Sequence, residues 1–291
     1  MINKFIFLLC LLSSINLQAA QHIPAMPDEL LTYKTVNDKN LKLHMFYPEG
    51  YKKSDSRPAI IFFFGGSWNV GKPKQFYEQS KYLASRGMVA ISAEYRVRSR
   101  DKSTPYDSVR DGNSAIRWVR KHAKSLGINP NEIIAGGGSA GGHIAAAAAT
   151  TVKYDEANED LSISSQPNAL VLFNPVFDNG PGGFGYDRVK PQWQDFSPMH
   201  NIHKDTPPTI MFFGTNDKFV PIETAKKYKA IMDKNQLRAE LFIYQGKPHG
   251  FFNFHHKQSF SETVIETDKF LVSLGYLNGK NTMSKYLGQS D

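Results

Sequence analysis

A single serine stands at the centre of a glycine-rich turn, Gly137-Gly138-Ser139-Ala140-Gly141. The apolar run 132–135 precedes this turn and the alanine-rich stretch 144–150 follows it, which predicts a strand, a sharp turn and a helix. Glycines on both sides leave room for a strained backbone, so the Ser139 hydroxyl would project from the end of the strand. A serine held in this way could act as a nucleophile, although the same five-residue pattern also arises by chance.

A serine nucleophile needs a base and an acid, and both residue types follow later strands of the chain. Asp217 lies in the loop after the predicted strand 209–213, and His249 lies in the loop after the predicted strand 241–244. The order Ser139, Asp217, His249 is typical of α/β-hydrolases and differs from the order in the two large serine protease groups. His249 would accept the serine proton, and Asp217 would hold the imidazole in the required tautomer.

Other residues could supply the same chemistry. Asp178, just after the predicted strand 169–173, is the competing acid, and Asp217 could simply cap the next helix. Among the nine histidines, the other downstream candidates for the base are His203, His255 and His256. We favour Asp217 and His249 because the three required residue types then occur at three loop positions where this chemistry needs them.

The turn that follows the apolar strand 59–64 could complete the site. Its residues Gly65-Gly66-Ser67-Trp68 are mostly small, which would let backbone N–H groups face the serine. We expect the N–H groups of Gly66 and Ser67 to join that of Ala140 in an oxyanion hole. The alternative is a tight turn in which Trp68 only fills the core.

Short apolar strands alternate with helical patterns along the rest of the chain. The expected strands are 31–36 and 41–47, which form a hairpin, then 59–64, 89–93, 132–135, 169–173, 209–213 and 241–244. The expected helices are 75–86, 106–126, 144–150, 222–232 and 263–274. This alternation predicts an α/β fold with a mostly parallel, twisted sheet covered by helices on both faces. Functional groups in such sheets collect at the carboxyl ends of the strands.

Taken together, these motifs resemble the esterase–lipase branch of the α/β-hydrolases, and in particular exported bacterial acetylxylan and feruloyl esterases. The segments that carry the resemblance are 63–68, 92–96, 137–143, 214–217 and 249–252. The resemblance implies the α/β-hydrolase fold and a serine esterase that removes small acyl groups, acetyl above all, from carbohydrate or other alcohol esters. One departure is Phe64, because the branch usually has a histidine there that braces the oxyanion loop.

The long segment after the strand 169–173 carries aromatic residues near the expected mouth of the site. Phe184, Tyr186 and Trp193, together with Trp68, could stack on a sugar or an aromatic acyl group, or could only pack the segment onto the body. The alternative functions are a general short-chain carboxylesterase or lipase-like enzyme, a serine exopeptidase and a non-catalytic binding protein. A chain of 291 residues leaves little room for the extra domain that such peptidases carry.

The N-terminus has the pattern of a signal peptide. A basic start at 1–4 precedes the apolar run 5–12, and small residues at 19–20 offer a cleavage site. We therefore expect residues 1–20 to be removed, with export to the periplasm or the medium; a buried N-terminal helix is the alternative. The mature chain, 21–291, is expected to form one domain, with the last ~15 residues as a loose tail. Removal of Cys10, the single cysteine, would exclude a thiol nucleophile.

The remaining composition narrows the expected partners. The formal net charge is +8, but the lysines are scattered and form no basic run with interleaved aromatics, which argues against nucleic acid. The glycines at 136–142 lack the lysine of a phosphate-binding loop, and no metal-ligand spacing stands out, so we expect no cofactor. His143 is interpreted as a packed or capping residue. The expected partner is an ester substrate, an acylated saccharide, with no stable membrane anchor.

Overall fold

The computed structural model describes residues 24–151 and 153–288. Within them, eight strands form one sheet in the order β1-β2-β4-β3-β5-β6-β7-β8. The strands are β1 Glu29–Val36, β2 Lys39–Phe46, β3 Arg57–Phe63, β4 Val89–Ala93, β5 Ile128–Gly138, β6 Ala169–Phe173, β7 Thr209–Gly214 and β8 Ala239–Tyr244. β2 runs antiparallel to both of its neighbours, and the other pairings are parallel. The parallel strands therefore end at one common edge.

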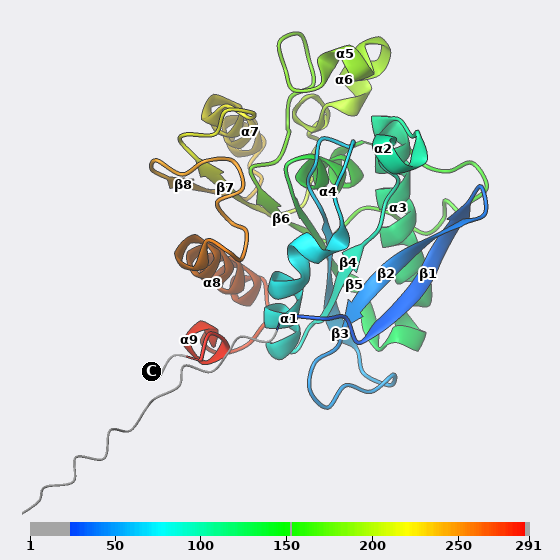
Figure 1. The fold of residues 1–291 in the computed structure, drawn as a ribbon, viewed down its shortest axis with the longest axis vertical. Coiled ribbons are helices and arrows are strands. Elements are labelled where there is room, and N and C mark those ends of the chain that lie inside the picture. Colours follow the sequence, from blue (N-terminus) through cyan, green and yellow to red (C-terminus); the bar gives the residue numbers. More distant parts are fainter. Residues whose placement is uncertain (1–23, 152, 289–291) are drawn as a thin grey trace, which may run out of the picture.

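Helices cover both faces of the sheet (Figure 1). The longer ones are α1 Tyr77–Ser85, α3 Pro105–His122, α4 Ala140–Thr150, α7 Ile222–Lys234 and α8 Lys257–Ser273. The shorter ones are η1 Pro73–Phe76, α2 Arg98–Asp101, η2 Ala123–Leu126, α5 Tyr186–Val189, η3 Lys190–Gln192, α6 Trp193–Phe196, η4 Pro198–Asn201 and α9 Met283–Tyr286. None of the described helices is both long and apolar enough to cross a bilayer.

Buried side chains form two apolar cores, one on each face of the sheet. Alternate residues of β3 show this division, because Ile61 and Phe63 belong to the core shared with α3, α4 and α7. Ile60 and Phe62 belong to the core shared with α1 and α8. A strand buried on both faces has a continuous apolar sequence, which is the pattern that predicted it.

The predicted fold class is confirmed, and the differences lie at element ends and in short helices that were not predicted, such as α2 and α5. The last long helix, α8, begins at Lys257 rather than near residue 263, because Ser259 and Phe260 are already buried against the sheet. The expected tail packs on the body as far as Leu287: Met283 is buried, and the Tyr286 hydroxyl donates to a carboxylate oxygen of Glu78 at 2.9 Å. The expected signal peptide, residues 1–20, lies outside the described residues.

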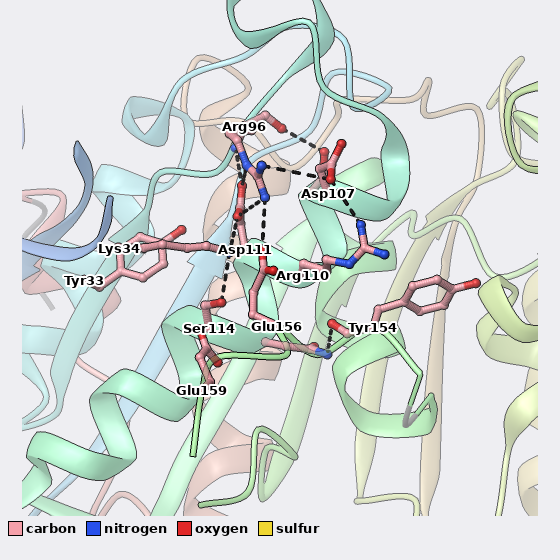
Figure 2. A network of polar contacts seen from close by, with 12 residues as sticks. Tyr33, Lys34, Arg96, Asp107, Arg110, Asp111, Ser114, Tyr154, Glu156 and Glu159 are labelled. Carbon is pink, nitrogen blue, oxygen red and sulfur yellow. Dashed lines mark hydrogen bonds and ion pairs between the residues drawn. The ribbon is translucent and has the colours of Figure 1, made fainter. Parts of the chain in front are cut away.

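A cluster of charged side chains joins β1, the loop after β4, α3 and the loop after α4 (Figure 2). At its centre the fully buried carboxylate of Asp111 accepts from Lys34 Nζ at 2.7 Å and from two nitrogens of the Arg96 guanidinium, each at 2.8 Å. Glu156 also accepts from Lys34 Nζ, at 2.6 Å. We call these four residues, with Asp107 and Arg110 at its rim, the Asp111 cluster. The cluster holds Arg96, the residue that follows Tyr95 in the chain.

Candidate active site

The backbone between β5 and α4 places Ser139 at a strained turn. Its φ of 53° and ψ of −120° lie outside the favoured regions for a residue with a side chain. Glycines on either side make the turn possible: an added Cβ would lie 2.5 Å from the Phe63 carbonyl oxygen at Gly137 and 2.0 Å from it at Gly141. The Ser139 N–H donates to the Phe173 carbonyl at 2.9 Å, which fixes the turn to the end of β6.

His249 and Asp217 form a close pair at the same edge of the sheet. His249 Nδ1 lies 2.6 Å from Asp217 Oδ2, and the carboxylate is 1% exposed. The other carboxylate oxygen accepts from the N–H groups of Phe219 at 2.8 Å and Val220 at 3.0 Å. A buried carboxylate satisfied in this way keeps the proton on Nδ1, so Nε2 is left as the acceptor nitrogen.

The competing candidates do not contact this pair. Asp178 Oδ1 accepts from the N–H of Gly180 at 2.8 Å and so shapes its own loop. His203 Nδ1 accepts from the N–H of Asp205 at 3.2 Å, within its own turn. His255 and His256 pack against one another with their rings tilted by 46° and the ring centroids 4.0 Å apart.

Asn174 is a neighbour of the histidine that the sequence analysis missed. Its side-chain amide nitrogen lies 3.2 Å from His249 Nδ1, and the residue is fully buried with a φ of 34°. A signal was present, because Asn174 directly follows β6 at the edge where functional groups collect. Because Nδ1 carries the proton that faces Asp217, the amide nitrogen packs beside this part of the ring and does not donate to it.

Ser139 and His249 line one cavity of about 410 Å³. Its other lining residues are Gly65, Gly66, Ser67, Val70, Gly71, Lys72, Gln75, Phe184, Phe219, Gly250, Phe252 and Asn253. No hydrogen bond among the described residues engages the Ser139 hydroxyl. The same holds for the three expected oxyanion donors, the N–H groups of Gly66, Ser67 and Ala140. The cavity therefore combines a free hydroxyl, an oriented imidazole and unpaired N–H groups.

The loop 64–68, which we call the oxyanion loop, is held from outside at three points. The Tyr95 hydroxyl donates to the Phe64 carbonyl at 2.5 Å, and Gln75 Oε1 accepts from the Gly65 N–H at 2.6 Å. Arg188 Nη1 donates to the Ser67 carbonyl at 2.6 Å. These contacts stabilise a backbone in which Ser67 has a φ of 57°, a conformation that side chains disfavour.

Among the four expected substrate contacts, only Phe184 lines the cavity. Trp68 is 1% exposed and packs edge-on against His143, with ring centroids 5.0 Å apart. Trp193 packs edge-on against His200, and Tyr186 lies beneath the Lys190 ammonium group. Burial gives Trp68 a packing role and overturns its expected contact with substrate. Tyr186 and Trp193 pack within their own segment, and their contact with substrate stays a prediction. Two apolar residues at the cavity, Val70 and Phe219, were missed.

His143, interpreted from the sequence as a packed residue, is fully buried behind the turn. Burial lowers its pKa to about 3, although the hydrogen bond between Nε2 and the Phe196 carbonyl favours the charged form. The imidazole therefore stays neutral and contributes packing against Trp68 and Phe196. In the part of the chain that the structure describes, no group of histidine, cysteine, aspartate or glutamate side chains could hold a metal ion.

A larger depression lies at the other edge of the sheet. Its volume is about 860 Å³, and it is lined by residues that precede β6 and β7, including Asn168 and Pro208. The Arg120 guanidinium beside it already donates to the backbone carbonyls of Pro130 and Gln166. This depression contains none of the chemistry described above, so the cavity at the carboxyl edge is the candidate site.

Comparison with known proteins shows the family of this chain. The BD-FAE family model matches residues 43–179, and the dienelactone hydrolase family model matches residues 189–272. The solved apo structure of esterase 2 from Thermogutta terrifontis superposes with a TM-score of 0.84 at 43% identity, and covers 89% of this chain and 98% of that one. The chain belongs to the esterases of the α/β-hydrolase fold.

Two further matches carry a bound ligand or a named substrate of their own. The Thermogutta terrifontis enzyme has also been solved with butyrate bound, and that structure matches with a TM-score of 0.83 at 42% identity over 88% of this chain and 96% of that one. An acetylxylan esterase from Xylanibacter ruminicola is 27% identical over 259 residues, which is 82% of this chain and 50% of the relative. The chain thus spans about half the length of that curated relative.

Proposed function

We propose that this chain is a serine carboxylic-ester hydrolase that acts through an acyl-enzyme on Ser139. The observation that carries the proposal is the His249–Asp217 contact of 2.6 Å at the cavity that Ser139 also lines. The carboxylate holds the Nδ1 proton, which leaves Nε2 to accept the serine proton. Esterase activity in the structural relatives supports this chemistry, and the triad is our assignment for this chain.

The proposed reaction has two halves. Ser139 Oγ attacks the ester carbonyl carbon while its proton passes to His249 Nε2, and a tetrahedral oxyanion forms. The carbon–oxygen bond to the alcohol then breaks, and the imidazolium returns the proton to the leaving oxygen. Water then attacks the carbonyl carbon of the acyl-enzyme and gives a proton to Nε2. The bond from that carbon to Ser139 Oγ breaks, the imidazolium returns the proton to Oγ, and the acid leaves.

The oxyanion would be held by backbone donors. We assign the N–H groups of Gly66, Ser67 and Ala140, which have no partner among the described residues, to this role. Ala140 is the first residue of α4, so the positive end of the helix dipole adds to its N–H. Removing one such donor from a serine hydrolase typically costs about 10²–10³ in kcat.

The substrate class that we infer is esters of short acyl chains, with acetyl groups on a saccharide as the preferred member. The likeness to an acetylxylan esterase and the butyrate seen in a relative both support a small acyl group. A general short-chain carboxylesterase is the second candidate. It is favoured by the rim of the cavity, where the apolar side chains Val70 and Phe219 are 49% and 60% exposed.

A substrate panel tests both candidates. We expect p-nitrophenyl acetate to be cleaved faster than the octanoate, and acetate to be released from acetylated xylo-oligosaccharides. Release of p-nitrophenol from short esters without acetate from the sugars would select the general carboxylesterase. An aminoacyl p-nitroanilide included in the panel should remain intact; its cleavage would favour the exopeptidase, and inertness towards every substrate would favour a binding protein.

Variants test the mechanism itself. Ser139→Ala should lower kcat for p-nitrophenyl acetate by about 10⁴–10⁶ while the circular dichroism spectrum stays unchanged, because the covalent intermediate cannot form. Activity within about tenfold of the wild type would remove Ser139 from the mechanism.

We also propose that the protein is exported. The basic, apolar and small-residue order of residues 1–20 supports a cleaved signal peptide. Mass spectrometry of protein recovered from the periplasm or medium should find an N-terminus near Ala20 or Gln21. Exported protein that still begins with Met1 would contradict the proposal.

A further inference from the structure

Two amide side chains join the oxyanion loop to the loop of His249. Gln75, in η1, accepts at Oε1 from the N–H of Gly65 at 2.6 Å, and its Nε2 donates to Asn253 Oδ1 at 3.0 Å. Asn253 Nδ2 then donates to the carbonyl of Gly250, the residue after His249, at 2.8 Å. Both side chains line the catalytic cavity. We call the path Gly65–Gln75–Asn253–Gly250 the amide relay.

The direction of the relay is fixed by the backbone at its two ends. The Gly65 N–H can only donate, so the oxygen of Gln75 must face it and the nitrogen must face Asn253. The Gly250 carbonyl can only accept, so the nitrogen of Asn253 must face it and the oxygen must face Gln75. Rotating either amide by 180° would place like atoms against each other at two points. The relay therefore has a single satisfied arrangement.

The relay acts on a peptide group that is also held at its other end. The Gln75 side chain binds the N–H of the Phe64–Gly65 peptide, and the Tyr95 hydroxyl binds its carbonyl at 2.5 Å. A peptide plane held at both polar ends cannot rotate freely. The peptides that follow it present the N–H groups of Gly66 and Ser67, so their direction depends on this plane.

We propose that Gln75 and Asn253 are positioning residues that keep the oxyanion donors and the His249 imidazole at a fixed distance and orientation relative to each other. The proposal rests on the triad mechanism proposed above. In that mechanism the oxyanion and the imidazolium form in the same step, so their spacing matters for the transition state more than for substrate binding. A displacement of about 1 Å at such groups can cost roughly 10² in rate.

Three variants test the relay against p-nitrophenyl acetate. Gln75→Leu removes both of its contacts, and Asn253→Leu removes the contacts to Gln75 and Gly250. Gln75→Glu keeps an acceptor for the Gly65 N–H but loses the donor to Asn253. We expect Gln75→Leu to lower kcat by about 10–100-fold with KM within about threefold, and Gln75→Glu to retain more of kcat than Gln75→Leu.

Binding of a transition-state mimic supplies the readout that a purely structural role would not change. A trifluoromethyl ketone forms a tetrahedral oxyanion on the serine, so its Ki should rise in parallel with the loss of kcat. The double variant Gln75→Leu/Asn253→Leu should be no more than about threefold worse than the worse single variant, because the two residues act as one path.

Gln79→Leu is the matched control. Gln79 also lies on this side of the molecule, in α1, and its Nε2 donates to the Phe252 carbonyl at 3.3 Å without reaching the oxyanion loop. We expect this variant to lower the melting temperature while kcat and the Ki of the ketone stay within about twofold.

Two outcomes would overturn the inference. One is a Gln75→Leu enzyme with kcat and ketone Ki within about twofold of the wild type. The other is a Gln79→Leu enzyme that loses as much kcat as Gln75→Leu, since general loosening would then explain both. If either result is found and the Ser139→Ala enzyme is inactive, the relay is refuted but the triad mechanism stands. If the Ser139→Ala enzyme is active, the mechanism on which the relay rests is refuted.

Discussion

Replacing Asp111 by asparagine should destabilise this fold far more than an ordinary charge change. The Asp111 side chain has no exposed surface and accepts from Lys34 Nζ, from the Arg96 N–H and from two guanidinium nitrogens of Arg96. Asparagine has nearly the same shape but turns one acceptor into a donor. The Asp111 cluster would also change from three cations and three anions to a net charge of +1.

The magnitude follows from the partners that remain. Removing one partner of a buried ion pair typically costs about 3–5 kcal/mol, because the other charge stays buried and unpaired. Glu156, whose side chain is 26% exposed, still accepts from Lys34, so we place the cost near the lower end, at about 3 kcal/mol. For a domain of this size that corresponds to a melting temperature lower by roughly 6–12 °C.

Urea denaturation followed by circular dichroism measures this cost, with Asp233→Asn as the matched control. Asp233 pairs with Lys229 on the surface of α7, and both side chains are more than a third exposed. Losing such a pair should cost at most about 0.5 kcal/mol. A loss of less than about 1 kcal/mol in Asp111→Asn, or equal losses in both variants, would refute the reasoning about burial.

Two further predictions concern the acid and the response to pH. Asp217→Asn should lower kcat by about 10³–10⁴ in stopped-flow or steady-state assays, because the amide favours the wrong imidazole tautomer, whereas Asp178→Asn should cost far less; the reverse ranking would transfer the role to Asp178. Burial lowers the pKa of His143 to about 3 in the folded state, against about 6.5 in the unfolded state. Between these two pH values only the unfolded state binds the extra proton, so the free energy of unfolding should fall as the pH drops from about 6.5 to about 3. The slope of unfolding free energy against pH should be smaller in His143→Phe, and equal slopes would assign the acid sensitivity to other groups.

The sequence predicted the elements because the buried parallel strands carry uninterrupted apolar runs. The strands at 89–93 and 169–173 match their predicted bounds for this reason. Chain order placed Ser139, Asp217 and His249 after strands whose carboxyl ends share an edge, so their proximity could be predicted without coordinates.

The features that the sequence did not predict depend on the direction in which side chains point. Trp68 carries the same aromatic group whether it faces a ligand or the core, and only the left-handed backbone of the oxyanion loop turns it inward. Gln75 and Asn253 lie far apart in the chain, and ordinary amide side chains give no periodic signal. Their contact depends on how η1 packs beside the loop after β8, which is a tertiary property.

A substitution at Phe64 tests whether the existing hydrogen bonds to the oxyanion loop are sufficient to hold it in place. The resemblance to the esterase–lipase branch leads one to expect a histidine there, but Phe64 is 1% exposed and stacks on Tyr95 with ring centroids 4.0 Å apart. Tyr95 and Gln75 hold the adjoining peptide instead. Phe64→His should therefore leave kcat within about threefold of the wild type. It should lower the free energy of unfolding by about 1–3 kcal/mol, because a polar ring nitrogen is buried in an apolar site.

The kcat of Phe64→His, measured in the wild-type and in the Gln75→Leu background, separates the contribution of Gln75 from that of a histidine at position 64. In the wild-type background a histidine has no free peptide to hold, so kcat should not rise. In the Gln75→Leu background the Gly65 N–H is left unpaired, and a histidine that reaches it should recover part of the lost kcat. Phe64→Leu controls for the loss of the aromatic stack and should recover nothing. An increase in kcat in the wild-type background would show that the loop is still free to move there, and that Gln75 and Tyr95 do not hold it by themselves.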